Sequence, residues 1–310
     1  MGRALAYAAV YVLWGASFLA VREIVLAAPP FLAAGFRFTI AGLVLIVWSR
    51  MLGAQWPSRR ELLSTAALGL LMFAINYACL FWAEQRVASG FAAIIASLIP
   101  VWIFAGEWLW LGVVRPGPAA ILGMVLGIGG VVLLVLPGGA LGWTAPSLAM
   151  LLGGVCWAVG TIWSRRMTLP RSRHASAGLQ MGFGGLVLLL AAVVAGEFAR
   201  VPDVLEHWNV RLTLDMAYLI GAASIAAFLA FVWLIDHEPA SRVASHAWVN
   251  PLIAIAVGAL VAGERLAPMQ IAGAALVVAG VIVTLRCKAG AARQPDFRLA
   301  SATGRRMNRI

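Results

Sequence analysis

Long apolar runs with almost no charged side chains dominate this sequence, and short breaks rich in proline and glycine separate them. An α-helix needs about 20 apolar residues to cross the hydrocarbon core of a bilayer, and each run is close to that length. Of the 310 residues, 63% are hydrophobic and 11% are charged, whereas a soluble domain is roughly 45–50% apolar and about 25% charged. A soluble core cannot bury that much apolar surface. The pattern therefore excludes a soluble enzyme, a nucleic-acid-binding domain and a disordered chain.

The runs predict an all-α integral membrane protein with ten transmembrane helices. Breaks such as Pro29-Pro30 and Pro137-Gly138-Gly139 mark boundaries between them. The first run is too long for a cleaved signal peptide. The predicted spans are residues 4–26, 31–49, 62–83, 90–112, 118–136, 146–166, 175–196, 212–235, 243–262 and 268–286.

Positive charge is distributed unevenly over the predicted loops. With the N-terminus inside, 17 of the 23 Lys and Arg residues lie on the inner side, five lie on the outer side and Arg37 lies within a span. Because inner loops of membrane proteins are enriched in Lys and Arg, we expect both termini in the cytoplasm. Lys288 is the only lysine, a bias typical of a GC-rich bacterial genome, so we expect a bacterial inner (plasma) membrane. The net charge of +11 thus indicates topology, and we expect no nucleic-acid partner.

The two halves of the chain resemble each other. Residues 35–45 align with residues 178–188 at a shift of 143, and the same shift pairs Trp14 with Trp157. Each half contains five predicted spans, and an odd number inverts the second half relative to the membrane. Inverted repeats of this kind are typical of secondary transporters.

The repeat predicts how the chain is organised. We expect a single membrane domain made of a first five-helix repeat at 1–140 and a second, inverted repeat at 141–286. Residues 287–310 are expected to form a basic cytoplasmic tail near anionic lipid headgroups.

The nucleophilic and titratable side chains form no pattern that indicates an enzyme or a metal site. Cys79, Cys156 and Cys287 match neither a zinc site nor a disulfide framework. The four histidines are scattered along the chain, and no two carboxylates face each other on one helix. We therefore expect no catalytic residues, no metal and no cofactor.

Two prolines indicate a substrate site in the middle of the bilayer. Pro100 and Pro251 occupy matching positions of the two halves, at a shift of 151. A proline inside a helix leaves a carbonyl without its amide donor, and in lipid that carbonyl needs another partner. Matched breaks are typical of transporter sites, so we predict that both prolines act as helix breaks or gates. Simple packing kinks are the alternative.

Polar and aromatic side chains cluster at a similar depth in the predicted spans. Together they would line a cavity with aromatic walls and a few hydrogen-bonding groups. For a tryptophan in mid-span, packing inside the protein is an equal alternative. His246 shares a helix face with Asn250 and could couple protons, but a neutral, hydrogen-bonded histidine is the simpler interpretation. The predicted substrate-binding residues are Trp14, Ser17, Asn76, Tyr77, Ser97, Trp102, Trp157, Trp163, Phe228, Ser245, His246, Trp248 and Asn250.

Ionisable groups in or directly beside membrane spans are candidates for function, and Arg37, Glu84 and Glu107 are the charged candidates considered. Arg37 and Glu84 lie toward the outer ends of their spans. We predict that they form an ion pair, which would serve as a gate or as a structural tie. Glu107 lies near the inner end of its span and is expected to reach the headgroups.

Five short motifs follow one another in a defined order: residues 13–18, Gly35-Phe36-Arg37-Phe38, residues 88–100, Asn250-Pro251 and Gly263-Glu264-Arg265-Leu266. Together they resemble the EamA type of the drug/metabolite transporter superfamily, over nearly the whole span region. Residues 83–90 are similar to the amino-acid and metabolite exporter branch. The family often repeats the Gly-Glu-Arg element after the fourth helix, where this chain has Val113-Val114-Arg115.

The resemblance implies a secondary-active transporter that exports a small-molecule substrate by alternating access around a cavity between the repeats. The aromatic candidates suggest aromatic or other bulky neutral amino acids, or similar metabolites. A lipid or lipid-linked sugar flippase on the same fold is the alternative. The bilayer is the other expected partner. Small-xxx-small patterns at 123–127 and 178–182 are expected to pack within a monomer, and a dimer is left open.

Overall fold

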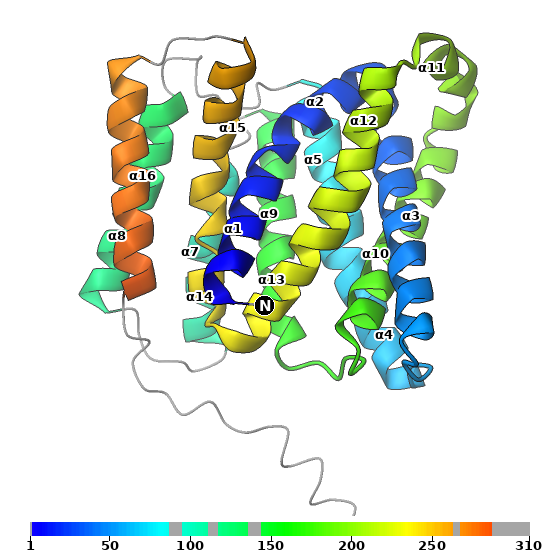
Figure 1. Cartoon of the computed structure of the whole chain (residues 1–310), viewed down its shortest axis with the longest axis horizontal. Coiled ribbons are helices and arrows are strands. Elements are labelled where there is room, and N and C mark those ends of the chain that lie inside the picture. The colour runs from blue at the N-terminus through cyan, green and yellow to red at the C-terminus, as the bar shows by residue number, and fades with distance from the viewer. Residues whose placement is uncertain (1, 87–94, 111–116, 136–143, 263–266, 287–310) are drawn as a thin grey trace, which may run out of the picture.

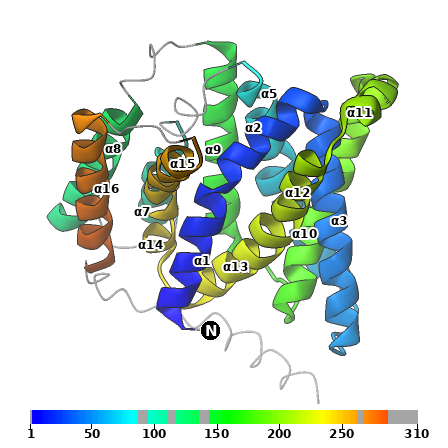
Figure 2. The same ribbon diagram turned by 45° about the horizontal axis from the view of Figure 1, so that its top comes forward.

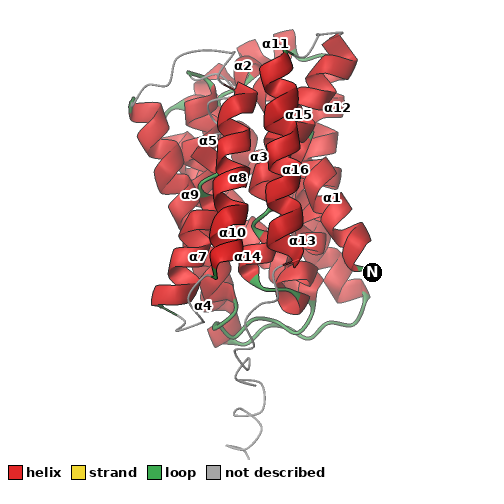
Figure 3. Ribbon diagram, turned by 90° about the vertical axis from the view of Figure 1, so that its left-hand side faces the viewer, coloured by secondary structure: helices red, strands yellow, loops and turns green. Residues whose placement is uncertain are grey.

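The structure, a computed structural model, describes residues 2–86, 95–110, 117–135, 144–262 and 267–286. Within these ranges every regular element is helical and no strand occurs. The helices run side by side between two ends of the molecule (Figure 1, Figure 3). We call the end at which the N-terminus lies the N-terminal end and the opposite one the distal end.

The two halves of the chain contain comparable sets of helices. The first half contains α1 (Arg3–Gly15), α2 (Ser17–Ala27), α3 (Pro30–Met51), α4 (Arg59–Leu68), η1 (Gly69–Ile75), α5 (Asn76–Glu84), α7 (Ile99–Leu109) and α8 (Pro118–Val135). The second half contains α9 (Ala145–Ser164), α10 (Arg173–Val194), η3 (Glu197–Arg200), α11 (Val201–His207), α12 (Val210–Tyr218), η4 (Leu219–Ala226), α13 (Ala227–His237), α14 (Ala240–Val243), α15 (His246–Ala262) and α16 (Pro268–Arg286). The segments η1 and η4 are π-helical.

Six helical stretches of the described chain are long and apolar enough to cross a membrane. They agree with six of the predicted spans to within three residues at each end. The six are Arg3–Ala27, Pro30–Met51, Arg59–Glu84, Ala145–Ser164, Arg173–Val194 and Val210–His237. Shorter apolar helices occupy Ile99–Leu109, Pro118–Leu133 and Ile271–Thr284.

Some predictions fall outside the described residues. These are the start and end of the predicted span 90–112, the tail at 287–310 with Cys287, and the motifs at 88–90, 113–115 and 263–266.

Local sequence determines where several helices begin and end. At the start of α4, the Glu61 N–H donates to the Ser58 hydroxyl while the Ser58 N–H donates to the Glu61 carboxylate, which is a capping box. Both α3 and α10 are followed by a glycine with positive φ, Gly53 at 75° and Gly196 at 71°. Glycine adopts this conformation without steric cost and so ends a helix cleanly. The two glycines are 143 residues apart, which is the shift of the sequence repeat.

Two helix pairs, α3 with α10 and α8 with α16, make the most extensive contacts of the bundle (Figure 1). Each pairs a helix of the first half with its counterpart in the second half. A Cβ atom on Gly42 would lie 2.6 Å from the Gly182 nitrogen, and one on Gly280 would lie 2.6 Å from the Gly127 nitrogen. Only glycine permits backbones to approach this closely. Both small-xxx-small patterns therefore pack within one chain, as predicted.

Large apolar side chains cover the outside of these pairs. Leu43 and Val47 on α3, Leu186 and Leu190 on α10 and Val125 on α8 are each more than half exposed. In water such a surface would favour aggregation, whereas in a bilayer it faces lipid tails. The helix pairs thus place charge and polarity inside the bundle and apolar surface outside it.

We expect Gly130→Ala to destabilise the protein and Gly129→Ala to leave its stability unchanged or slightly raised. A Cβ at position 130 would lie 2.6 Å from the Val277 nitrogen and 2.7 Å from the Gly273 oxygen, whereas one at position 129 meets nothing within 4 Å. Overpacking of this kind costs about 1–3 kcal/mol. Thermal unfolding of both variants in detergent measures the difference, and equal melting temperatures would contradict the α8–α16 contact.

Candidate functional site

Several helices near the centre of the bundle, where α1 lies beside α15, are interrupted (Figure 2). Ala16 separates α1 from α2, and turns precede α7 at residues 97–98 and α15 at residues 244–245. Pro100 lies in the first turn of α7, whereas Pro251 lies inside α15. An interruption therefore occurs shortly before each of the two matched prolines.

The π-helical segments η1 and η4 begin 150 residues apart, at related positions of the two halves. Segments of this kind occur often at functional sites, because they rotate the side chains that follow them. Asn76 and Tyr77 directly follow η1 and face the interior. Within η4, the Ser224 hydroxyl donates to the Leu219 carbonyl at 2.8 Å.

Arg37 is buried in the bundle, with 2% of its surface exposed. Its Nε donates to the Ser224 Oγ at 2.8 Å. Its guanidinium carbon lies 4.7 Å from the centre of the Phe38 ring and 5.5 Å from that of Tyr77. A hydrogen bond and ring faces of this kind reduce the free-energy cost of burying a cation. A π segment of the second half thus holds a charge of the first half in place.

These elements surround a cavity of about 100 Å³ between the middle of the bundle and its distal end. Nine residues predicted from the sequence line it: Trp14, Ser17, Arg37, Asn76, Tyr77, Glu84, Trp157, His246 and Asn250. No sequence signal distinguishes the remaining wall residues, because they are small or apolar like the residues of the packed interior. They are Phe18, Val21, Leu80, Ala96, Ile99, Met150, Gly154 and Ala247.

Two predicted binding residues lie on the outside of the bundle. Trp102 and Trp163 are 37% and 43% exposed and do not line the cavity. Depth along a span can be inferred from sequence position, but the direction of a side chain around the helix depends on how the helices pack.

The other predicted binding residues outside the cavity are Ser97, Phe228, Ser245 and Trp248, and all four are buried. The Trp248 Nε1 donates to the Ser97 carbonyl at 3.0 Å, and its ring belongs to a cluster with valines of α8 and α16. Phe228 packs in the aromatic core, and Ser245 hydrogen-bonds the Tyr11 hydroxyl at 2.7 Å. These residues hold helices together rather than face the cavity.

Aromatic rings form one wall of the cavity. The Trp14 indole donates to the Ala223 carbonyl at 2.8 Å and meets Trp157 edge to face, with ring centres 5.6 Å apart. The ring centre of His246 lies 4.9 Å from that of Trp14. His246 Nδ1 lies 2.9 Å from the Val243 carbonyl, which can only accept, so Nδ1 is the donor. The wall is therefore fixed by hydrogen bonds to the backbone.

Several polar atoms of the lining residues have no hydrogen-bond partner among the described residues. They are both carboxylate oxygens of Glu84, Nη1 of Arg37, Oδ1 of Asn250 and Nε1 of Trp157. Glu84 is fully buried, and Arg22 contacts its backbone carbonyl rather than its carboxylate. Most buried polar groups in proteins are hydrogen-bonded, so this concentration of exceptions around one cavity indicates a ligand site.

The predicted ion pair between Arg37 and Glu84 is not formed in this structure, because neither Glu84 oxygen has a partner among the described side chains. The physical reason is that Ser224 and two aromatic rings hold the guanidinium. Both side chains line the same cavity without a direct ion pair.

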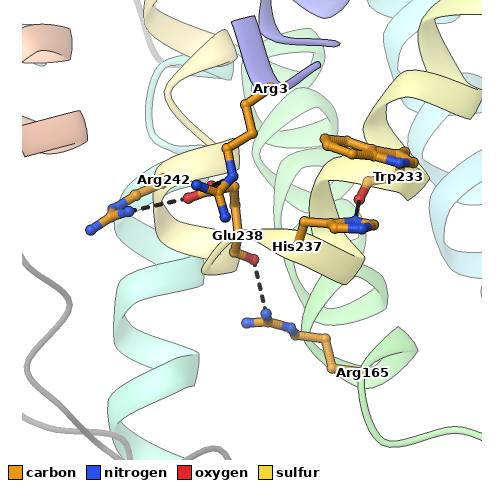
Figure 4. A network of polar contacts seen from close by, with 6 residues as sticks. All are labelled: Arg3, Arg165, Trp233, His237, Glu238 and Arg242. Carbon is orange, nitrogen blue, oxygen red and sulfur yellow. Dashed lines mark hydrogen bonds and ion pairs between the residues drawn. The ribbon is translucent and has the colours of Figure 1, made fainter. Parts of the chain in front are cut away.

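A polar network ties the N-terminal end together (Figure 4). The Glu238 carboxylate pairs with the Arg3 Nε at 2.8 Å and the Arg242 Nη1 at 3.1 Å, and the Glu238 carbonyl accepts from Arg165 at 2.9 Å. Arg165 also pairs with Glu107 at 3.3 Å. Glu107 is 7% exposed, so it binds Arg165 instead of reaching the headgroups as expected. The network joins α1, α7, α9, α13 and α14 on the side of the molecule away from the cavity.

No group of three or more His, Cys, Asp or Glu side chains in the described part of the chain is placed to hold a metal ion. The side chains that line the cavity offer charged groups, hydrogen-bonding groups and aromatic surface.

Known proteins similar to this chain extend over most of its length. The pattern of the EamA-like transporter family matches residues 2–136 and 145–286. The uncharacterized inner membrane transporter YedA of Escherichia coli (strain K12) is 31% identical over 279 residues, which are 89% of each chain. The uncharacterized transporter YvbV of Bacillus subtilis (strain 168) is 25% identical over 297 residues, 92% of each chain. A probable terminal-alkyne amino-acid exporter of Streptantibioticus cattleyicolor is 26% identical over 272 residues, 87% of each chain.

A solved crystal structure resembles the fold, with a TM-score of 0.70 and 21% sequence identity. The match covers 91% of this chain and 95% of the other. The helical arrangement is therefore shared over nearly the whole length.

Proposed function

Because the chain belongs to the EamA-like transporter family, we propose that it is a secondary-active transporter that exports amino acids or similar small metabolites. Its family and its relatives are membrane transporters, so the chain is a membrane transporter and not an enzyme. The observation that carries the proposal is the cavity, in which opposite charges and aromatic rings face one space. Export as the direction rests on the family resemblance and on the relative that is named an exporter.

The cavity volume bears on the size of the substrate. About 100 Å³ is less than the roughly 300–1,000 Å³ of most small-molecule sites. In this conformation the cavity suits a small amino acid or the head group of a larger one. Aromatic or other bulky neutral amino acids would require the distal ends of the helices to move apart.

We propose ten spans arranged as two inverted five-helix repeats, 1–140 and 141–286, in one membrane domain with a basic tail at 287–310. The stacked helix pairs and the matched π segments support this arrangement. Repeat-related arginines support it as well. Arg22 donates to the Glu84 carbonyl near the distal end, and Arg165 donates to the Ile235 carbonyl near the N-terminal end. The arginines are 143 residues apart and their acceptors are 151 apart, in agreement with the repeat.

The N-terminal end is proposed to face the cytoplasm of a bacterium, with both termini on that side. The excess of 17 positive side chains over five supports this orientation. The relative YedA, which is named an inner membrane transporter, supports the inner membrane as the location.

Alternating access would operate between the two ends of the cavity. The network around Glu238 ties the N-terminal end, whereas the cavity reaches Glu84 at the distal end of α5. The structure is thus interpreted as an outward-facing or outward-leaning state. Rocking of one half against the other would break the network and expose the cavity to the cytoplasm.

A lipid or lipid-linked sugar flippase is the other function considered for this fold. Such a protein needs a cavity that opens sideways into the bilayer. Residues from α1, α2, α3, α5, α7, α9 and α15 surround the cavity, which favours a small solute.

We expect saturable counterflow of amino acids in proteoliposomes, and its loss in Trp157→Ala but not in Trp163→Ala. Trp157 lines the cavity, whereas Trp163 is 43% exposed outside it. Removing a buried aromatic wall costs about 3–5 kcal/mol of packing and contact energy, so folding of both variants is checked by size-exclusion chromatography. The panel contains alanine, threonine, methionine, phenylalanine and tryptophan. Flat traces for all five with folded wild-type protein would overturn the amino-acid proposal in favour of lipid substrates.

We expect a fluorescent protein fused after residue 310 to be fluorescent in cells and alkaline phosphatase fused there to be inactive. The fluorescent protein matures only in the cytoplasm and the phosphatase only outside it. Both reporters fused at position 140, between the proposed repeats, give the reverse result if five spans precede it. The same result at both positions would contradict an odd number of spans in the first repeat.

We expect Glu238→Gln to increase local opening of the N-terminal end. The substitution removes the negative charge that two arginines share, and hydrogen bonds to charged groups contribute about 1.5–3 kcal/mol each. Hydrogen exchange measured by mass spectrometry should become faster in peptides that cover α14 and the start of α15. Glu206→Gln is the matched control, because Glu206 is exposed on α11. Unchanged exchange in α14 would argue that the network does not restrain this end.

A further inference from the structure

Arg37 and Glu84 are ionisable groups of opposite sign on the wall of one cavity, and no ion pair or hydrogen bond between described atoms joins them. Glu84 is fully buried and Arg37 is 2% exposed. A buried charge that lacks hydrogen-bond partners destabilises a protein unless a group of opposite charge binds it. The pair therefore favours a ligand that carries both an anion and a cation.

Arg37 is positioned before any ligand binds. Its Nε bond to Ser224 and its contacts with the rings of Phe38 and Tyr77 fix the guanidinium plane. Its Nη1 remains without a partner among the described residues. A fixed guanidinium matches the planar geometry of a carboxylate and loses little side-chain entropy when it binds one.

Glu84 keeps its carboxylate available at the distal end of α5. Arg22 donates to the Glu84 backbone carbonyl, and Arg86 donates to the Trp82 carbonyl. In the described part of the chain, neither oxygen of the Glu84 carboxylate has a hydrogen-bond partner. A primary ammonium group, with three donors, would satisfy both oxygens.

We propose that Arg37 and Glu84 recognise the two ends of a zwitterion, with Arg37 binding the carboxylate of an amino acid and Glu84 binding its ammonium group. The inference rests on the proposed function, since it names the substrate chemistry of the same cavity. Asn250 Oδ1 and Trp157 Nε1, also without partners, provide a further acceptor and a further donor. A cavity of about 100 Å³ is the right scale for such a head group.

Two other roles for these charges explain less of the geometry. A structural ion pair between Arg37 and Glu84 would neutralise both side chains, but these two side chains form no such pair in this structure. A proton on Glu84 would neutralise one charge and leave Arg37 uncompensated. A zwitterion neutralises both charges at once and uses the partners that each side chain lacks.

The test compares three forms of one molecule in wild-type and charge-removed protein. Inhibition of L-alanine counterflow at pH 7 is measured for L-alanine, N-acetyl-L-alanine and L-alaninamide, which carry both charges, only the carboxylate and only the ammonium group. If another amino acid of the panel exchanges faster, its three forms are used. The variants are Glu84→Gln and Arg37→Gln, with Glu206→Gln and Arg60→Gln as exposed controls of the same chemistry.

We expect a crossed pattern of affinities. Wild-type protein and both controls should bind the zwitterion at least about tenfold more tightly than either analogue, because each analogue leaves one buried charge unpaired. In Glu84→Gln the preference for an ammonium group should disappear while the preference for a carboxylate remains. In Arg37→Gln the reverse should hold. A structural or proton-carrying role would not produce this reciprocity.

The outcomes separate failure of the inference from failure of the proposed function. No counterflow of any amino acid by folded wild-type protein would overturn the proposed function and the inference with it. Saturable counterflow with equal affinities for all three forms would overturn the inference alone. Uniform weakening of all three forms in both variants would also overturn it.

Stability provides a second readout if a variant transports poorly. Removing an unpaired buried carboxylate should leave Glu84→Gln at least as heat-stable as wild type without ligand. L-Alanine should then raise the melting temperature of wild type more than that of the variant. An equal rise in both proteins would contradict recognition of the ammonium group by Glu84.

Discussion

In a bilayer every backbone N–H and C=O must find its partner within the protein. In the described part of the chain, side chains bind several backbone carbonyls at or near the helix breaks and within the π segment η4. The pairs are Trp14 with Ala223, Ser224 with Leu219, Trp248 with Ser97 and His246 with Val243. Irregular backbone is therefore tolerated in the middle of the bundle, and the space beside it becomes a cavity rather than packed interior.

The same constraint divides the buried polar residues into two groups. Ser224, Ser245 and Trp248 bind backbone carbonyls or hold helices together. Glu84 and Asn250 keep side-chain oxygens that nothing in the described chain satisfies. Residues of the first group stabilise the interrupted backbone beside the cavity, and residues of the second group leave polar atoms in the cavity wall without a partner. This division explains why only part of a polar cluster in such a sequence contributes to binding.

Sequence predicted six of the spans to within three residues at each end, because hydropathy and the breaks depend only on local residues. The sequence also pointed to nine residues that line the cavity, because polar and charged side chains are rare in membrane spans and are candidates for function there. It placed Trp102 and Trp163 in the cavity wrongly, because rotation about a helix axis is set by packing against other helices. The π segments were not predicted, and each of them changes the direction in which the following side chains point around the helix axis.

The two halves share a frame but differ in their charges. Arg22 and Arg165 make equivalent contacts with the carbonyls of Glu84 and Ile235, yet only the first acceptor carries a carboxylate. The ion pairs of Glu238 tie the N-terminal end. In an inverted repeat the two open states are alike in geometry, so their relative free energies must come from such differences. In this chain, charged side chains line the cavity near the distal end, and the Glu238 network ties the N-terminal end. Both features would favour the state seen here, in which the cavity lies on the distal side.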